Sequence, residues 1–166
     1  MKHIVFIILI IFSFVSCSVK YSLSGASISP DIKTFTVEYI TNQAPQKQPT
    51  LSDIFTEGLK AKFRNNAGLT MVSSNGDLQF DGAIIDYNTK HQGVTATQVA
   101  AQMRLTISIS VNFVNVKEPS KNFKEKFSAY RDYDAQQSLN SVEDALIQEI
   151  SKEIIDQIFM KAVANW

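Results

Sequence analysis

Residues 103–113 read MRLTISISVNF, and this stretch has the most regular hydrophobic pattern in the chain. Apolar side chains occupy every second position, and polar ones occupy the positions between. Since successive side chains of a β-strand point to opposite faces of a sheet, this pattern predicts a strand over about residues 99–116. Its apolar face would pack on helices, and its polar face would meet water or a partner. The polar face carries Arg104, Thr106, Ser108, Ser110 and Asn112.

Three further strands are predicted on either side of this one. Residues 34–39 alternate polar and apolar side chains, and residues 122–130 do so after a loop at 117–120. The third strand covers residues 77–88. Its alternation is broken at Ile84-Ile85, which predicts a β-bulge near Gly82.

Two segments show the spacing of an amphipathic helix. The first places Leu51, Phe55, Leu59 and Phe63 on one face, and the second carries an apolar stripe from Leu139 to Ala162. The order strand, helix, three strands, helix predicts one α+β domain. We expect two amphipathic helices packed on one face of a largely antiparallel four-stranded sheet.

The first 16 residues differ in composition from the rest of the chain. A basic start is followed by a run from Ile4 to Val15 that only Ser13 interrupts. Twelve residues of helix span only about 18 Å, less than the roughly 30 Å of a bilayer core, so a signal peptide is favoured over a membrane-spanning helix.

Cys17, the only cysteine in the chain, follows this run directly. The sequence Phe14-Val15-Ser16-Cys17 resembles a bacterial lipobox, which predicts removal of residues 1–16 and lipidation of Cys17. Residues 17–31 would then be the lipidated tether, and residues 32–166 the folded domain. No acidic cluster follows Cys17, so we expect the periplasmic face of an outer membrane. An ordinary signal peptide with an incidental cysteine, or a short membrane anchor, remains an alternative.

Composition excludes several classes of protein. The 16 basic and 16 acidic residues give a formal charge of zero, and without residues 1–16 the charge is −1. This balance argues against nucleic-acid binding. The apolar content of 45% argues against a disordered chain.

Catalytic patterns are lacking. His91 is expected in a solvated polar loop, and the aspartates show no spacing suited to acid–base chemistry. The chain has no phosphate-binding glycine motif and no nucleophile motif. We therefore expect no enzymatic activity, no catalytic residue, no metal site and no cofactor.

Several basic residues fall on or beside the last two predicted strands. If these strands are neighbours, a cationic patch on the exposed sheet would suit an anionic lipid headgroup. The alternative is a solvated strand face with lysines that protect a sheet edge. The candidates are Arg104, Lys121, Lys124, Lys126 and Arg131.

Several stretches, taken in order, resemble the LptE family of lipopolysaccharide-assembly outer-membrane lipoproteins, in its Bacteroidetes-type form. They span nearly all of the chain after residue 16. The matching stretches are residues 17–25, 33–37, 49–52, 75–82, 104–108, 127–133, 138–139 and 156–166.

The resemblance implies a two-helix, four-stranded α+β fold inside the lumen of a large β-barrel partner, LptD. It also implies a role in folding that barrel and in delivering lipopolysaccharide. Thr106, Ser108, Ser110 and Asn112 would then be barrel-facing. Two alternatives stay open: a scaffold or pilot lipoprotein of another outer-membrane machine, and a lipid-binding carrier with an apolar cavity.

Overall fold

Strand β5 (Gln102–Asn115) lies in the middle of the sheet, as its alternating sequence predicts. It pairs antiparallel with β4 (Leu78–Gln92) on one side and with β6 (Phe123–Asp134) on the other. Leu105, Ile107, Ile109, Val111 and Phe113 are all fully buried. The computed structural model describes residues 28–93 and 101–163. The predicted signal peptide, Cys17 and most of the predicted tether lie outside these residues.

The sheet differs from the predicted one in size and direction. It has six strands in mixed orientation, whereas four largely antiparallel strands were expected. The first part of the chain adds β1 (Thr34–Val37), β2 (Thr41–Asn42) and β3 (Thr70–Met71). The order is β3-β1-β4-β5-β6, with β2 also paired to β4.

The parallel part of the sheet follows from the position of the first helix. Helix α2 (Leu51–Asn66) lies between β1 and β4 in the chain, and β1 pairs with β4 in parallel. A helical crossover is the usual way to join two parallel strands, since a tight hairpin can join only antiparallel ones. β2 and β3 were not predicted, because a strand of two residues is too short to show an alternation of polar and apolar side chains.

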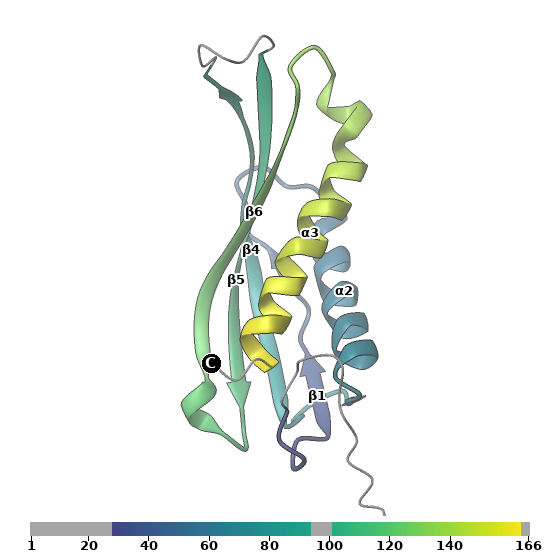
Figure 1. Ribbon diagram of the computed structural model, residues 1–166, viewed down its shortest axis with the longest axis vertical. Helices are drawn as coiled ribbons and strands as arrows, with labels where there is room; N and C mark the ends of the chain where they lie inside the picture. The colour runs from purple at the N-terminus through teal and green to yellow at the C-terminus, as the bar shows by residue number, and fades with distance from the viewer. Residues whose placement is uncertain (1–27, 94–100, 164–166) are drawn as a thin grey trace, which may run out of the picture.

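Both helices lie on one side of the sheet, as predicted (Figure 1). Helix α3 (Leu139–Val163) packs against α2 and over β5 and β6. The apolar stripe of each helix faces the sheet, because packing there removes its side chains from water. The core thus lies between the helix pair and one face of the sheet.

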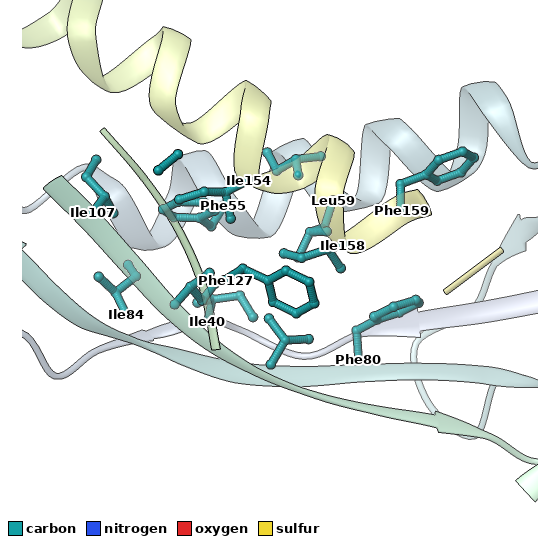
Figure 2. Packing of buried hydrophobic residues seen from close by; sticks show 14 of the residues in the cluster. Ile40, Phe55, Leu59, Phe80, Ile84, Ile107, Phe127, Ile154, Ile158 and Phe159 are labelled. Carbon is teal, nitrogen blue, oxygen red and sulfur yellow. The ribbon is translucent and has the colours of Figure 1, made fainter. Parts of the chain in front are cut away.

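Aromatic rings make up the centre of this core. The ring of Phe63 lies 4.5 Å from that of Phe80, 5.1 Å from that of Phe159 and 5.8 Å from that of Phe35. These rings connect α2, α3, β4 and β1 in one cluster. Figure 2 shows the neighbouring aliphatic side chains, among them Leu59 and Ile158, between the helices and the sheet.

Strand β4 is irregular at Ile84-Ile85, where the alternation breaks as predicted, but the bulge lies there and not near Gly82. The register shifts between Ile84 and Asp86, so the bulged residue is Ile85 and not Gly82. The bulge turns Ile85 outward, where it is 36% exposed. β4 also runs on to Gln92, so His91, expected in a loop, pairs with Met103 in the sheet.

Strand β6 is longer than predicted. It continues to Asp134, whereas the predicted strand ends at residue 130. Two contacts hold this end: Tyr133 is buried opposite Met103, and Asp132 pairs with Arg104. The connection from β5 contains the short 3-10 helix η2 (Pro119–Lys121), which overlaps the end of the predicted loop at 117–120.

The carboxylate of Asp77 fastens β1 to the start of β4. It accepts hydrogen bonds from the backbone N–H groups of Lys33 and Thr34, at 2.9 and 3.0 Å, and from the Thr34 hydroxyl at 2.9 Å. The Lys117 ammonium lies 3.4 Å away. These donors stabilise the charged form, so they lower the pKa of Asp77 to about 2, with the Lys33 N–H contributing most.

Candidate interaction surface on the open face of the sheet

The face of the sheet opposite the helices, here called the open face, is covered by none of the described helices (Figure 1). Its centre consists of five cross-strand rows from β4, β5 and β6, fixed by the strand register. Every residue in these rows except Ala83 carries a polar group. The rows are Lys90–Arg104–Asp132, Asn88–Thr106–Tyr130, Asp86–Ser108–Ser128, Ala83–Ser110–Lys126 and Asp81–Asn112–Lys124.

Hydrogen bonds between neighbouring strands order part of this surface. The hydroxyls of Ser108 and Ser128 lie 2.9 Å apart, and the Asn112 amide donates to the Asp81 carboxylate at 2.7 Å. Ser108 is only 1% exposed, so this hydrogen bond satisfies a buried hydroxyl. Thr106, Ser110 and Asn112 are half-buried and keep polar groups at the surface.

Arg104 is held in place at one end of the open face. Its guanidinium donates two hydrogen bonds to Asp132, at 2.6 and 2.8 Å, and lies 3.6 Å from the ring centre of Tyr130. The hydrogen bond raises the pKa of Arg104 and lowers the pKa of Asp132. Arg104 is therefore a positioned cation whose charge is already balanced.

Lys124 and Lys126 form the more available cationic pair. Both are exposed on β6, and no ion pair within residues 28–93 and 101–163 involves either of them. Lys124 lines a groove of about 300 Å³, together with Ser110 and Asn112. This groove also contains Asp81 and Gln43, so its chemistry is mixed and not purely cationic.

The structure separates the five predicted headgroup contacts. Arg131 pairs in register with Leu105 and lies on the helix side, where it donates to Glu149 at 2.9 Å and Glu153 at 2.7 Å. The two glutamates raise the pKa of Arg131, with Glu153 contributing most. Lys121 lies in η2, with its ammonium 2.9 Å from Glu118. Arg104, Lys124 and Lys126 thus share the open face, and Arg131 does not join them.

The acidic residues of the open face were not predicted to belong to the surface. Asp81 and Asp86 lie on β4; across β5, Asp81 shares a row with Lys124 and Asp86 shares a row with Ser128. The alternation of Leu78 and Phe80 with polar residues was the signal for this placement, but the bulge at Ile85 interrupts it. The open face therefore carries both charge signs.

A second hollow, also not predicted, lies between the two helices on their outer side. It measures about 330 Å³ and is lined in part by Gly58, Ala61 and Ser151. A Cβ at Gly58 would come within 2.4 Å of the Ile155 side chain, so the glycine lets the helices approach closely.

Side chains that could together hold a metal ion were sought among the described residues. No cluster of three or more histidine, cysteine, aspartate or glutamate residues occurs in residues 28–93 and 101–163. Within the same ranges, no helix is long and apolar enough to cross a membrane.

Comparison with known structures shows a shared fold. A minor lipoprotein from Acinetobacter baumannii is 16% identical with a TM-score of 0.51, and the match covers 78% of this chain and 91% of that one. Lipoprotein B from Nitrosomonas europaea is 11% identical with a TM-score of 0.52 and coverages of 77% and 80%. A hypothetical protein from Chlamydia trachomatis is 9% identical with a TM-score of 0.53 and coverages of 81% and 99%. At these identities the likeness concerns the fold alone.

Comparison of sequences identifies the family. No curated protein matches the chain. The model of the LptE family, described as lipopolysaccharide-assembly, matches residues 32–162. Since this match covers most of the chain, the protein belongs to the LptE family, whose members are non-enzymatic cell-envelope lipoproteins of lipopolysaccharide assembly.

Proposed function

We propose that the protein docks through its open face in the lumen of an LptD-type outer-membrane β-barrel, and helps that barrel to fold and to deliver lipopolysaccharide. The observation that carries this proposal is the difference between the two faces of the sheet. The helix side is packed and apolar, whereas the open face is polar in nearly every row. The lumen of a large outer-membrane barrel is itself polar, so hydrogen-bonding groups suit it better than an apolar patch does.

The anchor belongs to the same proposal. Removal of residues 1–16 and lipidation of Cys17 would hold the domain at the periplasmic face of the outer membrane. More than one acyl chain gives stable anchoring, since each buried CH₂ contributes about 0.8 kcal/mol. Residues 17–31 would then act as the tether.

Lipopolysaccharide contact is proposed chiefly for Lys124 and Lys126. These lysines are exposed on the open face, and ammonium groups pair well with phosphate. Arg104 and Lys121 remain candidates, although each has an acidic neighbour. Arg131 faces α3 and is proposed instead to hold the helix to the sheet.

The packing of the described core speaks against a lipid-binding carrier. Such a carrier needs a deep apolar cavity, yet the hollow that reaches the buried Ile32, Leu78 and Val163 measures only about 10 Å³. That volume is about the size of one water probe. A scaffold lipoprotein of another envelope machine shares the anchor and the fold, so only the partner distinguishes it.

Affinity purification from native outer membranes tests the proposal. The tagged full-length chain is extracted in mild detergent, and the proteins that copurify are identified. We expect one large barrel of the LptD type in amounts comparable to the chain. Recovery of a different envelope machine, with no such barrel, would replace the proposal by the scaffold alternative.

The anchor is tested separately with Cys17→Ala. This substitution removes the proposed acylation site, so we expect the chain to leave the outer-membrane fraction. A Cys17→Ala chain that still fractionates with the outer membrane would exclude lipid anchoring at this residue.

A further inference from the structure

The groove on the open face has room for a side chain of a partner. It measures about 300 Å³ and is lined by residues of β4, β5 and β6 and by Gln43, which directly follows β2. Its lining includes Gly82, Ala83 and Ser110, whose side chains are absent or small. Small residues let another molecule come close to the backbone. The polar groups around the groove indicate which side chain fits.

The amide groups of the groove have used donors and unused acceptors. The Asn112 amide donates to Oδ2 of Asp81 at 2.7 Å, and the Gln43 amide donates to the Thr41 hydroxyl at 3.3 Å. Within the described part of the chain, no hydrogen bond reaches Oδ1 of Asp81 or the side-chain carbonyl oxygens of Asn112 and Gln43. The groove therefore combines one charged acceptor with two neutral ones.

A guanidinium group matches this set of acceptors. It carries five N–H donors in a fixed plane and stays charged, whereas an ammonium group has three donors on a single nitrogen. Two of the five can bind one carboxylate, and the others remain for neutral oxygens. Ile85 also lines the groove and is 36% exposed. Its side chain offers apolar surface to the methylene stem of an arginine.

Lys124 lines the groove on the side away from Asp81. The two residues share a row but lie two strands apart, which the usual strand spacing puts at about 9–10 Å between Cα atoms. Lys124 is exposed, so its ammonium can extend into water while an arginine lies beside Asp81. An acidic side chain in the groove would meet this one cation but three acceptor oxygens. Charge complementarity therefore favours a cationic occupant.

We propose that the groove binds an arginine side chain that points into the lumen of the barrel, with Asp81 as its ion-pair partner. This inference rests on the proposed docking of the open face, and it names the contact that makes the docking specific. Asn112 and Gln43 accept hydrogen bonds from the remaining donors of the guanidinium. Lys124 and Lys126 stay available for phosphate groups.

Release of the barrel from the immobilised full-length chain tests the role of Asp81. The complex is purified in mild detergent, and the barrel that remains bound is measured during a timed wash. From Asp81→Asn we expect release at least about tenfold faster, because the arginine loses its charged partner. Added salt should speed release from the unsubstituted chain and have little effect on Asp81→Asn, since salt screens ion pairs.

Asp86→Asn is the matched control. Asp86 lies on the same strand and face, and it accepts one hydrogen bond from Asn88 at 2.6 Å, much as Asp81 does from Asn112. It does not line the groove, so its effect on release should be severalfold smaller. Equal acceleration by both substitutions, or none by Asp81→Asn, would overturn the inference and leave the barrel as partner. If no barrel copurifies with the unsubstituted chain, the proposed function fails and the inference fails with it.

A charge exchange tests whether the bound side chain is an arginine. Photo-cross-linking from position 110, which lines the groove, followed by mass spectrometry identifies the adjoining segment of the barrel. We expect an arginine in that segment. Asp81→Arg should release the barrel quickly, and an arginine-to-aspartate substitution in the barrel should restore most of the lost retention. A segment without arginine, or no recovery after the exchange, would overturn the inference.

Discussion

The two faces of strand β5 differ in what holds their side chains. On the helix side, five apolar residues from Leu105 to Phe113 are fully buried against α2, α3 and their own neighbours. On the open face, Arg104, Ser108 and Asn112 form hydrogen bonds or ion pairs with adjacent strands, and all the polar residues between them except Ser108 keep part of their side chains at the surface. One face of the strand therefore packs the core, and the other is the face proposed for recognition. Substitutions on the two faces should separate these roles.

The largest effect on stability is expected from Phe63→Ala on the helix side. This change removes a ring that contacts three other rings, and the cavity should lower the free energy of unfolding by about 3–5 kcal/mol. Urea unfolding of the purified chain measures it. Ser110→Ala, on the open face, should change it by less than about 0.5 kcal/mol. Similar losses for the two variants would contradict the division of roles.

A smaller loss is expected from Gly82→Ala, near the bulge in β4. An added Cβ would come within 2.4 Å of the backbone oxygen of Ser110, so β4 and β5 must move apart. Overpacking of this kind costs about 1–3 kcal/mol. Gly93→Ala is the control, because a Cβ there meets no atom within 4 Å. Equal midpoints in thermal unfolding would show that the close approach is not important.

The acid dependence of stability should distinguish two aspartates on β4 and at its start. Because the pKa of Asp77 is lowered to about 2, its charged form favours the folded state. This contribution is complete above the unfolded pKa near 4 and is lost as the pH falls through about 2. Asp77→Asn should therefore destabilise the protein at neutral pH and flatten the acid-induced loss between pH 4 and 2.

Asp81→Asn is the open-face counterpart of this substitution. Asp81 accepts one hydrogen bond from Asn112, whereas Asp77 ties together the backbone of two strands. At neutral pH, unfolding followed by circular dichroism should therefore show a smaller loss of stability for Asp81→Asn than for Asp77→Asn. Equal losses would mean that the open face contributes more to stability than proposed.

The smallest effect on stability is expected for the lysines of β6. Lys124→Glu with Lys126→Glu should leave the unfolding midpoint nearly unchanged, since both side chains are exposed. Binding to lipopolysaccharide vesicles at low salt should weaken about tenfold, which equals about 1.4 kcal/mol. Arg131→Gln should instead destabilise the helix contact and leave binding unchanged. Loss of binding in Arg131→Gln alone would reverse the assignment.

Much of the fold was predictable because its long elements show regular patterns. Alternation and helical stripes predicted the three long strands β4, β5 and β6, the four-residue β1 and both helices. β2 and β3 are too short to show a period, and the parallel pairing of β1 depends on how α2 crosses the sheet. The bulge was predicted near Gly82, but that glycine allows the close approach to Ser110, and the bulge falls at Ile85.

The candidate surface was predictable only in part, because strand register decides which side chains of neighbouring strands lie side by side. The alternation of residues 103–113 located the polar face of β5. Proximity in sequence suggested one patch from Lys121 to Arg131. However, alternate residues of a strand share a face, so Arg131 lies on the helix side with Phe127 and Ala129. The match of Arg104 with Asp132, and of Asn112 with Asp81, depends on strand register and cannot be obtained from spacing alone.

Site-specific photo-cross-linking in living cells most directly tests whether the open face is the functional surface. A photoreactive residue replaces Ser110 on the open face or Lys152 on the outer side of α3. The proposal predicts an adduct with a large outer-membrane barrel from position 110, and little or none from position 152. Barrel adducts from position 152 alone, or equally from both positions, would contradict it.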